Sequence, residues 1–260
     1  MQFLSETVSD GVWQRAFLVG DITGVLWSPH GAGGTAGPQP LILIGHGGGQ
    51  HKQAPGVVAR ARRFASLCGF AVAAIDVPGH GDRPRSEDDE RSTTAIRQKV
   101  EAGEPAGSLI AAYNAQLARR AVPEWRAVLD DLLALDGSDS AAPVGYWGIA
   151  LGGAIGLALV AAEPRISAAV IGLIGDEASQ AAATRVTIPV QMVLQWDDEL
   201  VPRLSGLALF DALASSEKTL HANSGRHMDV PRFEMESAER FFIRHLAGPD
   251  QSRARAAIAT

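Results

Sequence analysis

Short runs of consecutive apolar residues alternate with amphipathic segments along most of the chain. The apolar runs predict strands buried on both faces of a sheet, at residues 41–44, 71–77, 144–149, 166–174, 190–196 and 219–222. The segments between them predict helices at residues 55–67, 123–135, 151–162, 203–214 and 232–246. This alternation predicts an α/β fold with a doubly wound, mostly parallel sheet.

Two further segments modify this fold. Residues 12–19 and 22–27 flank a Gly20-Asp21 turn and predict an antiparallel hairpin at the start of the sheet. Residues 85–120 form an unusually long connection: 86–91 are mostly charged, and 93–119 read as helical with a break around 103–107. Long connections in compact domains are often functional, so this insertion is a candidate lid; a surface excursion without function is the alternative. The connection 176–189 is too short for that role.

Composition narrows the class of protein. The 260 residues suit a single domain spanning 1–260, and 46% hydrophobic with 20% charged residues is typical of globular proteins. A net charge of -6 argues against nucleic-acid binding. No apolar run approaches the ~20 residues of a membrane span, and residues 1–10 lack the basic start of a signal peptide. We therefore expect a soluble, cytoplasmic protein without membrane or nucleic-acid partners.

The segment 148–152 reads Gly-Ile-Ala-Leu-Gly and lies between a predicted strand and a predicted helix. A nucleophile elbow, G-x-S-x-G, has this context, because its serine lies on a sharp turn that needs flanking glycines. Both glycines are present here, whereas Ala150 stands at the serine position. On its own the motif is more typical of a glycine-rich helix start, so the residues that accompany it decide the interpretation.

A second glycine-rich loop, residues 45–50, follows the strand predicted at 41–44. Backbone N–H groups in such a loop can face a developing oxyanion, together with the N–H of Leu151. We favour Gly48 as the donor from this loop, with Gly49 as the alternative. A glycine turn without function is the other interpretation.

An acid and a histidine follow the segment 148–152 along the chain, in the order nucleophile, acid, histidine that accompanies a nucleophile elbow. Asp198 lies at the end of a predicted strand, in a D-x-x-V-P spacing, and would orient a histidine. The neighbouring Asp197 and Glu199 are expected to be solvated or to cap the next helix. His227 lies in the loop after the last predicted strand, which is the position that a general base requires. His46 is expected to shape the loop 45–50, and His80 to be structural or pocket-lining. His221 lies on the last predicted strand and is expected to be packed or exposed.

Together these residues resemble the α/β-hydrolase superfamily, and more narrowly its dienelactone-hydrolase-like and prolyl-oligopeptidase-like serine esterases. The resemblance covers nearly the whole chain, through the opening hairpin and residues 27–29, 46–49, 76–83, 148–152, 198–202 and 225–227. It implies hydrolysis of a small-molecule ester or lactone through an acyl-enzyme, without a cofactor. Dienelactone hydrolases commonly use a cysteine nucleophile, but the only cysteine, Cys68, lies far from 148–152 in the sequence.

Alanine at position 150 allows three interpretations. A parental serine has been replaced to inactivate the enzyme, or the chain is a natural pseudoenzyme that uses the pocket for binding. The retention of Asp198, His227 and both glycine loops favours the first, because an abandoned site is expected to lose them. The third interpretation is lyase, cyclase or acyl-transfer chemistry, since a fold does not fix a reaction.

The substrate pocket is expected to be apolar and lined by Trp147, Trp196 and Met228, although aromatic residues more often serve as core. Arg83 and Arg226 are candidates for an anionic substrate, but loop arginines more often form ion pairs. The sequence contains no phosphate loop, metal-ligand cluster or dinucleotide fingerprint. We therefore expect neither a metal nor a cofactor.

Overall fold

The computed structural model describes residues 1–31, 39–135 and 142–247. The strands within these ranges are β1 (Gln2–Ser9), β2 (Val12–Val19), β3 (Ile22–Pro29), β4 (Leu41–Ile44), β5 (Ala71–Ile75), β6 (Val144–Ile149), β7 (Ile166–Gly172), β8 (Val190–Gln195) and β9 (Lys218–Asn223). The helices are α1 (Pro55–Cys68), α2 (Glu87–Glu101), α3 (Gly107–Ala134), α4 (Leu151–Val160), α5 (Glu177–Ala183), α6 (Arg203–Ala212) and α7 (Phe233–Leu246).

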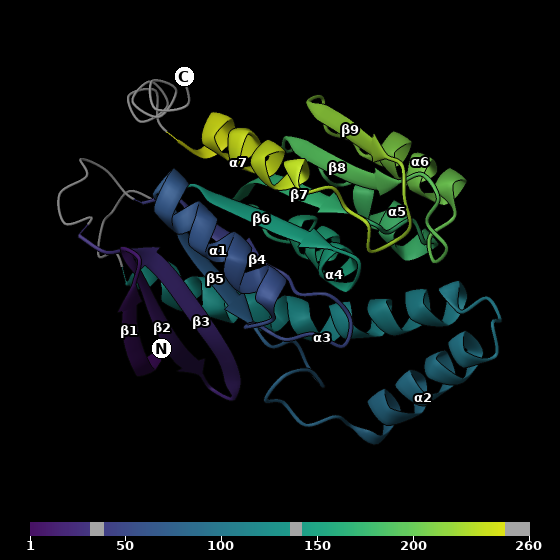
Figure 1. The fold of residues 1–260 in the computed structure, drawn as a ribbon, viewed down its shortest axis with the longest axis horizontal. Helices are drawn as coiled ribbons and strands as arrows, with labels where there is room; N and C mark the ends of the chain where they lie inside the picture. Colours follow the sequence, from purple (N-terminus) through teal and green to yellow (C-terminus); the bar gives the residue numbers. More distant parts are fainter. Residues whose placement is uncertain (32–38, 136–141, 248–260) are drawn as a thin grey trace.

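These strands form one sheet in the order β1-β2-β3-β5-β4-β6-β7-β8-β9 (Figure 1). The pairs among β1, β2, β3 and β5 are antiparallel, and every pair from β5 to β9 is parallel. The predicted α/β class, the mostly parallel sheet and the antiparallel hairpin at its start are therefore confirmed. The predicted strands end within two residues of the observed ones.

Both faces of the central sheet are buried, as the continuous apolar runs predict. In β4, Leu41 and Leu43 pack into a cluster with residues of α3, α4 and α6. The alternate residues Ile42 and Ile44 join the opposite cluster, which contains residues of α1 and α7 (Figure 1). Successive side chains of a strand point to opposite faces, so a strand covered on both sides needs apolar residues throughout.

The insertion after β5 forms a helical pair. Helix α2 packs on α3 and lies apart from the layers that cover the sheet (Figure 1). The predicted helices and the break between them are confirmed, but the predicted start of a helix at Pro123 is wrong, because α3 begins at Gly107 and runs through that proline. Burial of Leu117, Trp125 and Leu129 in the core stabilises the helix despite the backbone hydrogen bond that proline removes.

Strand β1 and helix α5 were not predicted from the sequence. Strand β1 is exposed along its whole length and pairs only with β2, so it has no buried face to produce an apolar alternation. Helix α5 lies in the short connection 176–189, for which no helix was predicted. Seven residues are too few for a helical period to stand out.

Gly156 lets α4 lie directly on the ring of Tyr146. A Cβ at this position would lie 1.9 Å from a carbon of that ring, which is fully buried. We expect Gly156→Ala to lower the free energy of unfolding by about 1–3 kcal/mol, measured by urea denaturation. Gly56→Ala is the control, since a Cβ there meets nothing within 4 Å and alanine favours a helix. Equal effects of the two changes would contradict the packing argument.

Candidate active site

Ala150 lies on a strained turn between the end of β6 and the start of α4. Its backbone has φ 53° and ψ -122°, a left-handed conformation that residues with a Cβ rarely adopt. Its N–H donates to the carbonyl oxygen of Gly172 on β7, at 3.0 Å. Such strain persists only where the surrounding structure enforces it, and it is concentrated at functional sites.

The glycines on either side of this turn are required by close backbone approach. A Cβ on Gly148 would lie 2.5 Å from the carbonyl oxygen of Gly152. A Cβ on Gly152 would lie 2.8 Å from the backbone of Gly45, in the other glycine-rich loop. Both glycines are therefore needed at this turn, and the two glycine loops are in direct contact.

His46 fixes the first glycine loop. Its Nδ1 lies 2.9 Å from the carbonyl oxygen of Gly47, and its Nε2 accepts a hydrogen bond from the N–H of Val77. Burial lowers the pKa of His46 to about 4, so its ring is neutral at neutral pH. The same carbonyl of Gly47 accepts from the N–H of Gln50. Because C=O and N–H point in opposite directions in a trans peptide, the N–H of Gly48 is held pointing away from both partners.

Asp198 and His227 form a buried hydrogen-bonded pair. Nδ1 of His227 lies 2.8 Å from Oδ2 of Asp198, and the other carboxylate oxygen accepts from the N–H groups of Leu200 and Val201. Burial alone would raise the pKa of Asp198, but these hydrogen bonds outweigh it and the pKa is lowered. The carboxylate is therefore ionised at neutral pH. It binds Nδ1 of His227, so Nε2 of the ring takes no part in the pair.

The acids beside Asp198 hold the histidine loop in place. Asp197 accepts a hydrogen bond from the N–H of Gly225, and Glu199 accepts one from the N–H of His227. They were expected to be solvated or to cap the following helix. Both are exposed, as expected, and they also bind the backbone that carries the imidazole. The sequence does not reveal this second role, because the two loops are distant in the chain.

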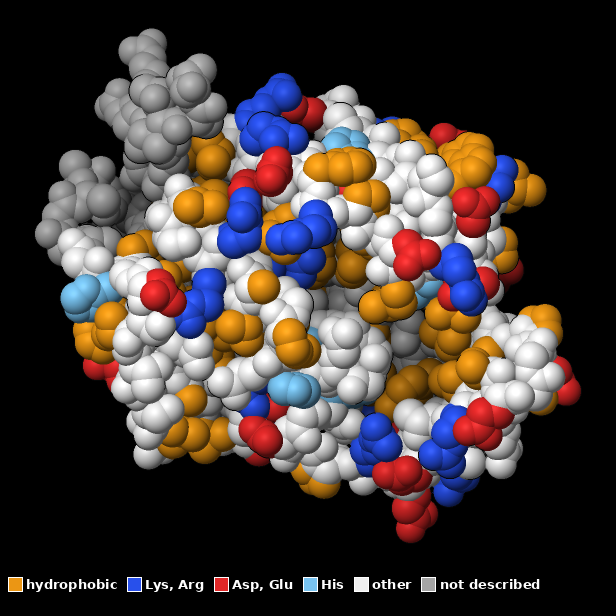
Figure 2. Space-filling model, in the orientation of Figure 1, with side chains coloured by type: hydrophobic (Ala, Val, Ile, Leu, Met, Phe, Trp, Pro, Cys, Tyr) orange, Lys and Arg blue, Asp and Glu red, His pale blue; other side chains and the backbone are white. Residues whose placement is uncertain are grey.

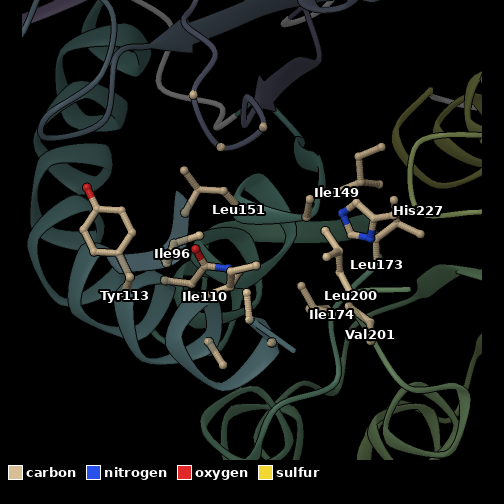
Figure 3. Close-up of a pocket in the computed structure, with 18 of the residues that line it drawn as sticks. Ile96, Ile110, Tyr113, Ile149, Leu151, Leu173, Ile174, Leu200, Val201 and His227 are labelled. Atoms are coloured by element: carbon tan, nitrogen blue, oxygen red, sulfur yellow. The ribbon is translucent and has the colours of Figure 1, made fainter. Parts of the chain in front are cut away.

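These residues line one cavity of about 1670 Å³, larger than the ~300–1,000 Å³ of common ligand pockets. Figure 2 shows this face of the molecule hollowed, with hydrophobic side chains along the hollow. Ala150, Leu151, Asp198, His227 and the loop 45–50 all contribute to the lining. Figure 3 shows His227 on one side of the cavity and side chains of α2 and α3 on the other: Ile96, Ile110 and Tyr113.

The candidate substrate-binding residues fall in different places. Trp147 and Met228 line the cavity, the first buried and the second exposed. Trp196 does not line the cavity; its ring is 41% exposed and carries the guanidinium of Arg203, 4.1 Å from the ring centroid. A strand-end residue can point to either face, and Trp196 points away from the cavity.

The structure resembles solved esterases. In the comparison of structures, a cold-adapted esterase from an Arctic intertidal metagenomic library, in a PEG-bound complex, is 32% identical, with a TM-score of 0.73 over 95% of this chain and 100% of that chain. The chain belongs to the α/β-hydrolase superfamily. Two more distant matches show the same fold: an acetyl xylan esterase from a Paenibacillus species (15% identity, TM-score 0.67, covering 94% and 88%) and dienelactone hydrolase from Anabaena variabilis (20%, 0.58, covering 93% and 98%). No family model and no curated protein matches the sequence.

Several lining residues of this α/β-hydrolase were not identified from the sequence. Leu173, beside the end of β7, has a positive φ of 57° and faces the cavity, although leucine carries no signal for such a conformation. Arg60 of α1 also lines the cavity, and only its register on the helix could have indicated this. In the part of the chain that the structure describes, no group of three or more His, Cys, Asp or Glu residues is placed to hold a metal ion, and no helix is long and apolar enough to cross a membrane.

Proposed function

We propose that the chain is a serine-esterase-type hydrolase in which alanine occupies the position of the nucleophile. The observation that carries the proposal is the buried Asp198–His227 pair, which lines the same cavity as the strained turn at Ala150. A nucleophile, a base and an acid that orients the base are the parts of a hydrolase that forms an acyl-enzyme. Two of the three are present, and the third position has the backbone of an elbow.

In the serine-containing parent, His227 removes the hydroxyl proton as that oxygen attacks the ester carbonyl. Asp198 fixes the tautomer of the imidazole and stabilises the imidazolium, because the carboxylate is ionised and bonded to Nδ1. As the tetrahedral intermediate collapses, the imidazolium gives its proton to the leaving oxygen, which departs as a neutral alcohol. Water, deprotonated by the same ring, hydrolyses the acyl-enzyme and restores the free site.

Two backbone N–H groups are assigned to the oxyanion of the tetrahedral intermediate. The carbonyl of Ala150 accepts from the N–H of Ala154, so the N–H of Leu151 in the same peptide points out of the start of α4. The N–H of Gly48 is directed by the bonds that hold the carbonyl of Gly47, which favours Gly48 over Gly49 as the second donor. Donors fixed before the reaction stabilise developing charge without reorganisation.

The wide apolar part of the cavity is assigned to the acyl or alcohol group of the ester. Its walls come from three directions: Leu151 on α4, Leu173 and Ile174 after β7, and Ile96 and Ile110 on α2 and α3 (Figure 3). A small acetyl group would leave this space unfilled. We therefore assign a bulky apolar substituent to the substrate, held between the sheet and the helical pair.

Ala150 itself favours a second candidate function, a protein that binds esters without turning them over. A methyl group cannot attack a carbonyl, whereas the pocket and the oxyanion donors do not depend on the missing hydroxyl. Both functions predict ester binding by the chain as it stands, and only the first predicts that a serine at position 150 becomes reactive.

The test is covalent labelling of the Ala150→Ser protein with an alkyl fluorophosphonate, followed by peptide mass spectrometry. We expect one phosphonate on residue 150, because such probes react with a serine activated by a histidine. The unchanged chain is the matched control and should stay unlabelled. A folded Ala150→Ser protein that takes up no label at residue 150 would refute the hydrolase proposal and leave the binding function.

A further inference from the structure

Arg60 lies on α1 and brings a positive charge to the wall of the cavity. Its guanidinium stacks on the ring of Trp147, with the central carbon 3.5 Å from the ring centroid. Both residues belong to the cavity lining, together with the loop that contains Gly48. The stack fixes the plane of the guanidinium and leaves its N–H groups along the edges for hydrogen bonding.

The hydrogen-bonding capacity of this guanidinium is not filled within the described residues. One nitrogen donates to the carbonyl oxygen of Gly56 at 3.0 Å, and Nε is buried without an acceptor. No described Asp or Glu lies within ion-pair distance of Arg60; Glu239, whose charge acts on it, is bonded by both ends of the Arg63 guanidinium. Burial lowers the pKa of Arg60 to about 10, against a small opposing effect of Glu239.

Other arginines near the site differ from Arg60. Arg83 is paired with Glu124, and Arg226 with Glu199, so the two arginines considered from the sequence already have protein partners. Arg85 and Arg97 also line the cavity, but Arg85 is paired with Glu90 and Arg97 is exposed, and an ion pair in water contributes little. A half-buried cation without a counterion is unfavourable, so we single out Arg60 as the position where an anionic ligand gains most.

We infer that Arg60 is a subsite for a carboxylate carried by the ester substrate. The inference rests on the proposed function, since it places the carboxylate on the same ligand as the ester. Trp147, beneath the guanidinium, lies near the end of β6, three residues before the turn at Ala150, and three residues of extended chain span at most about 10 Å. The carboxylate is therefore separated from the reacting carbonyl by a spacer of several atoms, and half-esters of straight-chain diacids have this form.

The test uses the chain as it stands, because alanine at position 150 allows binding to be measured without turnover. Monoethyl esters of succinic, adipic and suberic acid are titrated calorimetrically against the corresponding diethyl esters. We expect at least one half-ester to bind about tenfold or more tightly than its neutral diester, the effect of a charge-assisted hydrogen bond. Arg60→Gln should remove this preference, so that the ratio of the half-ester and diester affinities falls to about one.

Two variants separate the subsite from a general effect of charge or folding. Arg62→Gln removes a charge from the same helix, but Arg62 bonds to Ser9 and Asp10 outside the cavity, so the preference should remain. Arg60→Lys keeps a cation over Trp147 and should keep part of the preference. A preference that survives in Arg60→Gln, or equal binding of half-ester and diester by the unchanged chain, would overturn the subsite alone. Binding of neither class of ester would instead refute the ester pocket itself.

Discussion

Replacement of Ala150 by serine is expected to raise the turnover of p-nitrophenyl esters by about 10⁴- to 10⁶-fold over the unchanged chain. Removal of the nucleophile from a serine hydrolase costs up to about 10⁶ in kcat, because the oxyanion donors and substrate binding alone retain little of the catalysis. The elbow is already formed with a Cβ at φ 53°, so the hydroxyl can be added without a change of the backbone. The measurement is kcat for p-nitrophenyl butyrate and longer acyl esters.

The prediction concerns the rise in kcat on Ala150→Ser, and KM shows whether substrate binding has changed as well. Because the pocket is unchanged, the affinity for the ester should be similar in both proteins, and the gain should appear in kcat. Ala150→Cys offers a second nucleophile of different chemistry and should give a smaller gain, since the proposed mechanism uses a hydroxyl. An Ala150→Ser protein that unfolds at the same urea concentration as the unchanged chain but hydrolyses no ester would contradict the proposed mechanism.

The sheet could be predicted from the sequence because its central strands are buried on both faces. Residues 41–44 and 190–196 are short, mostly apolar runs, each preceded by a proline and followed by a loop, and such runs fit a covered strand. Strand β1 could not be predicted in the same way, because its stability comes from hydrogen bonds to β2 rather than from an apolar face. The start of α3 was misplaced because Pro123 is a strong signal for a first turn, while tertiary packing decided otherwise.

The candidate site also contains residues that the sequence could locate and residues that it could not. Residues whose proposed function depends on backbone position, such as Ala150 and Gly48, could be placed in the site by their position between a strand and a helix. Residues whose function depends on side-chain direction could not: Trp196 was expected in the pocket and points away from it, while Arg60 lines the pocket and was not considered. A shift of one residue along a strand turns a side chain to the opposite face of the sheet. The local sequence does not indicate which face lies against a distant loop.

In the Ala150→Ser protein, Asp198→Asn is expected to lower kcat by about 10⁴-fold. The amide oxygen can still accept the N–H groups of Leu200 and Val201, so the loop should keep its conformation. What changes is the partner of Nδ1 on His227: an amide neither stabilises the imidazolium nor enforces the tautomer in which Nε2 accepts the hydroxyl proton. The pKa of Asp198 lies below its usual range, so the loss concerns an ionised carboxylate at every pH near neutrality.

Asp197→Asn, in the same Ala150→Ser background, distinguishes the role of Asp198 from the general effect of removing a negative charge. Asp197 is adjacent in the sequence and exposed, and it bonds to the backbone of Gly225 rather than to the imidazole. The amide oxygen of asparagine can still accept the N–H of Gly225, so this replacement should leave kcat close to that of the parent. If both changes lowered kcat equally, the electrostatic field of the loop would be responsible and the specific pairing of Asp198 with His227 would not. A large loss confined to Asp198→Asn, with KM unchanged, is the result that the geometry requires, because only that carboxylate reaches Nδ1 of the ring.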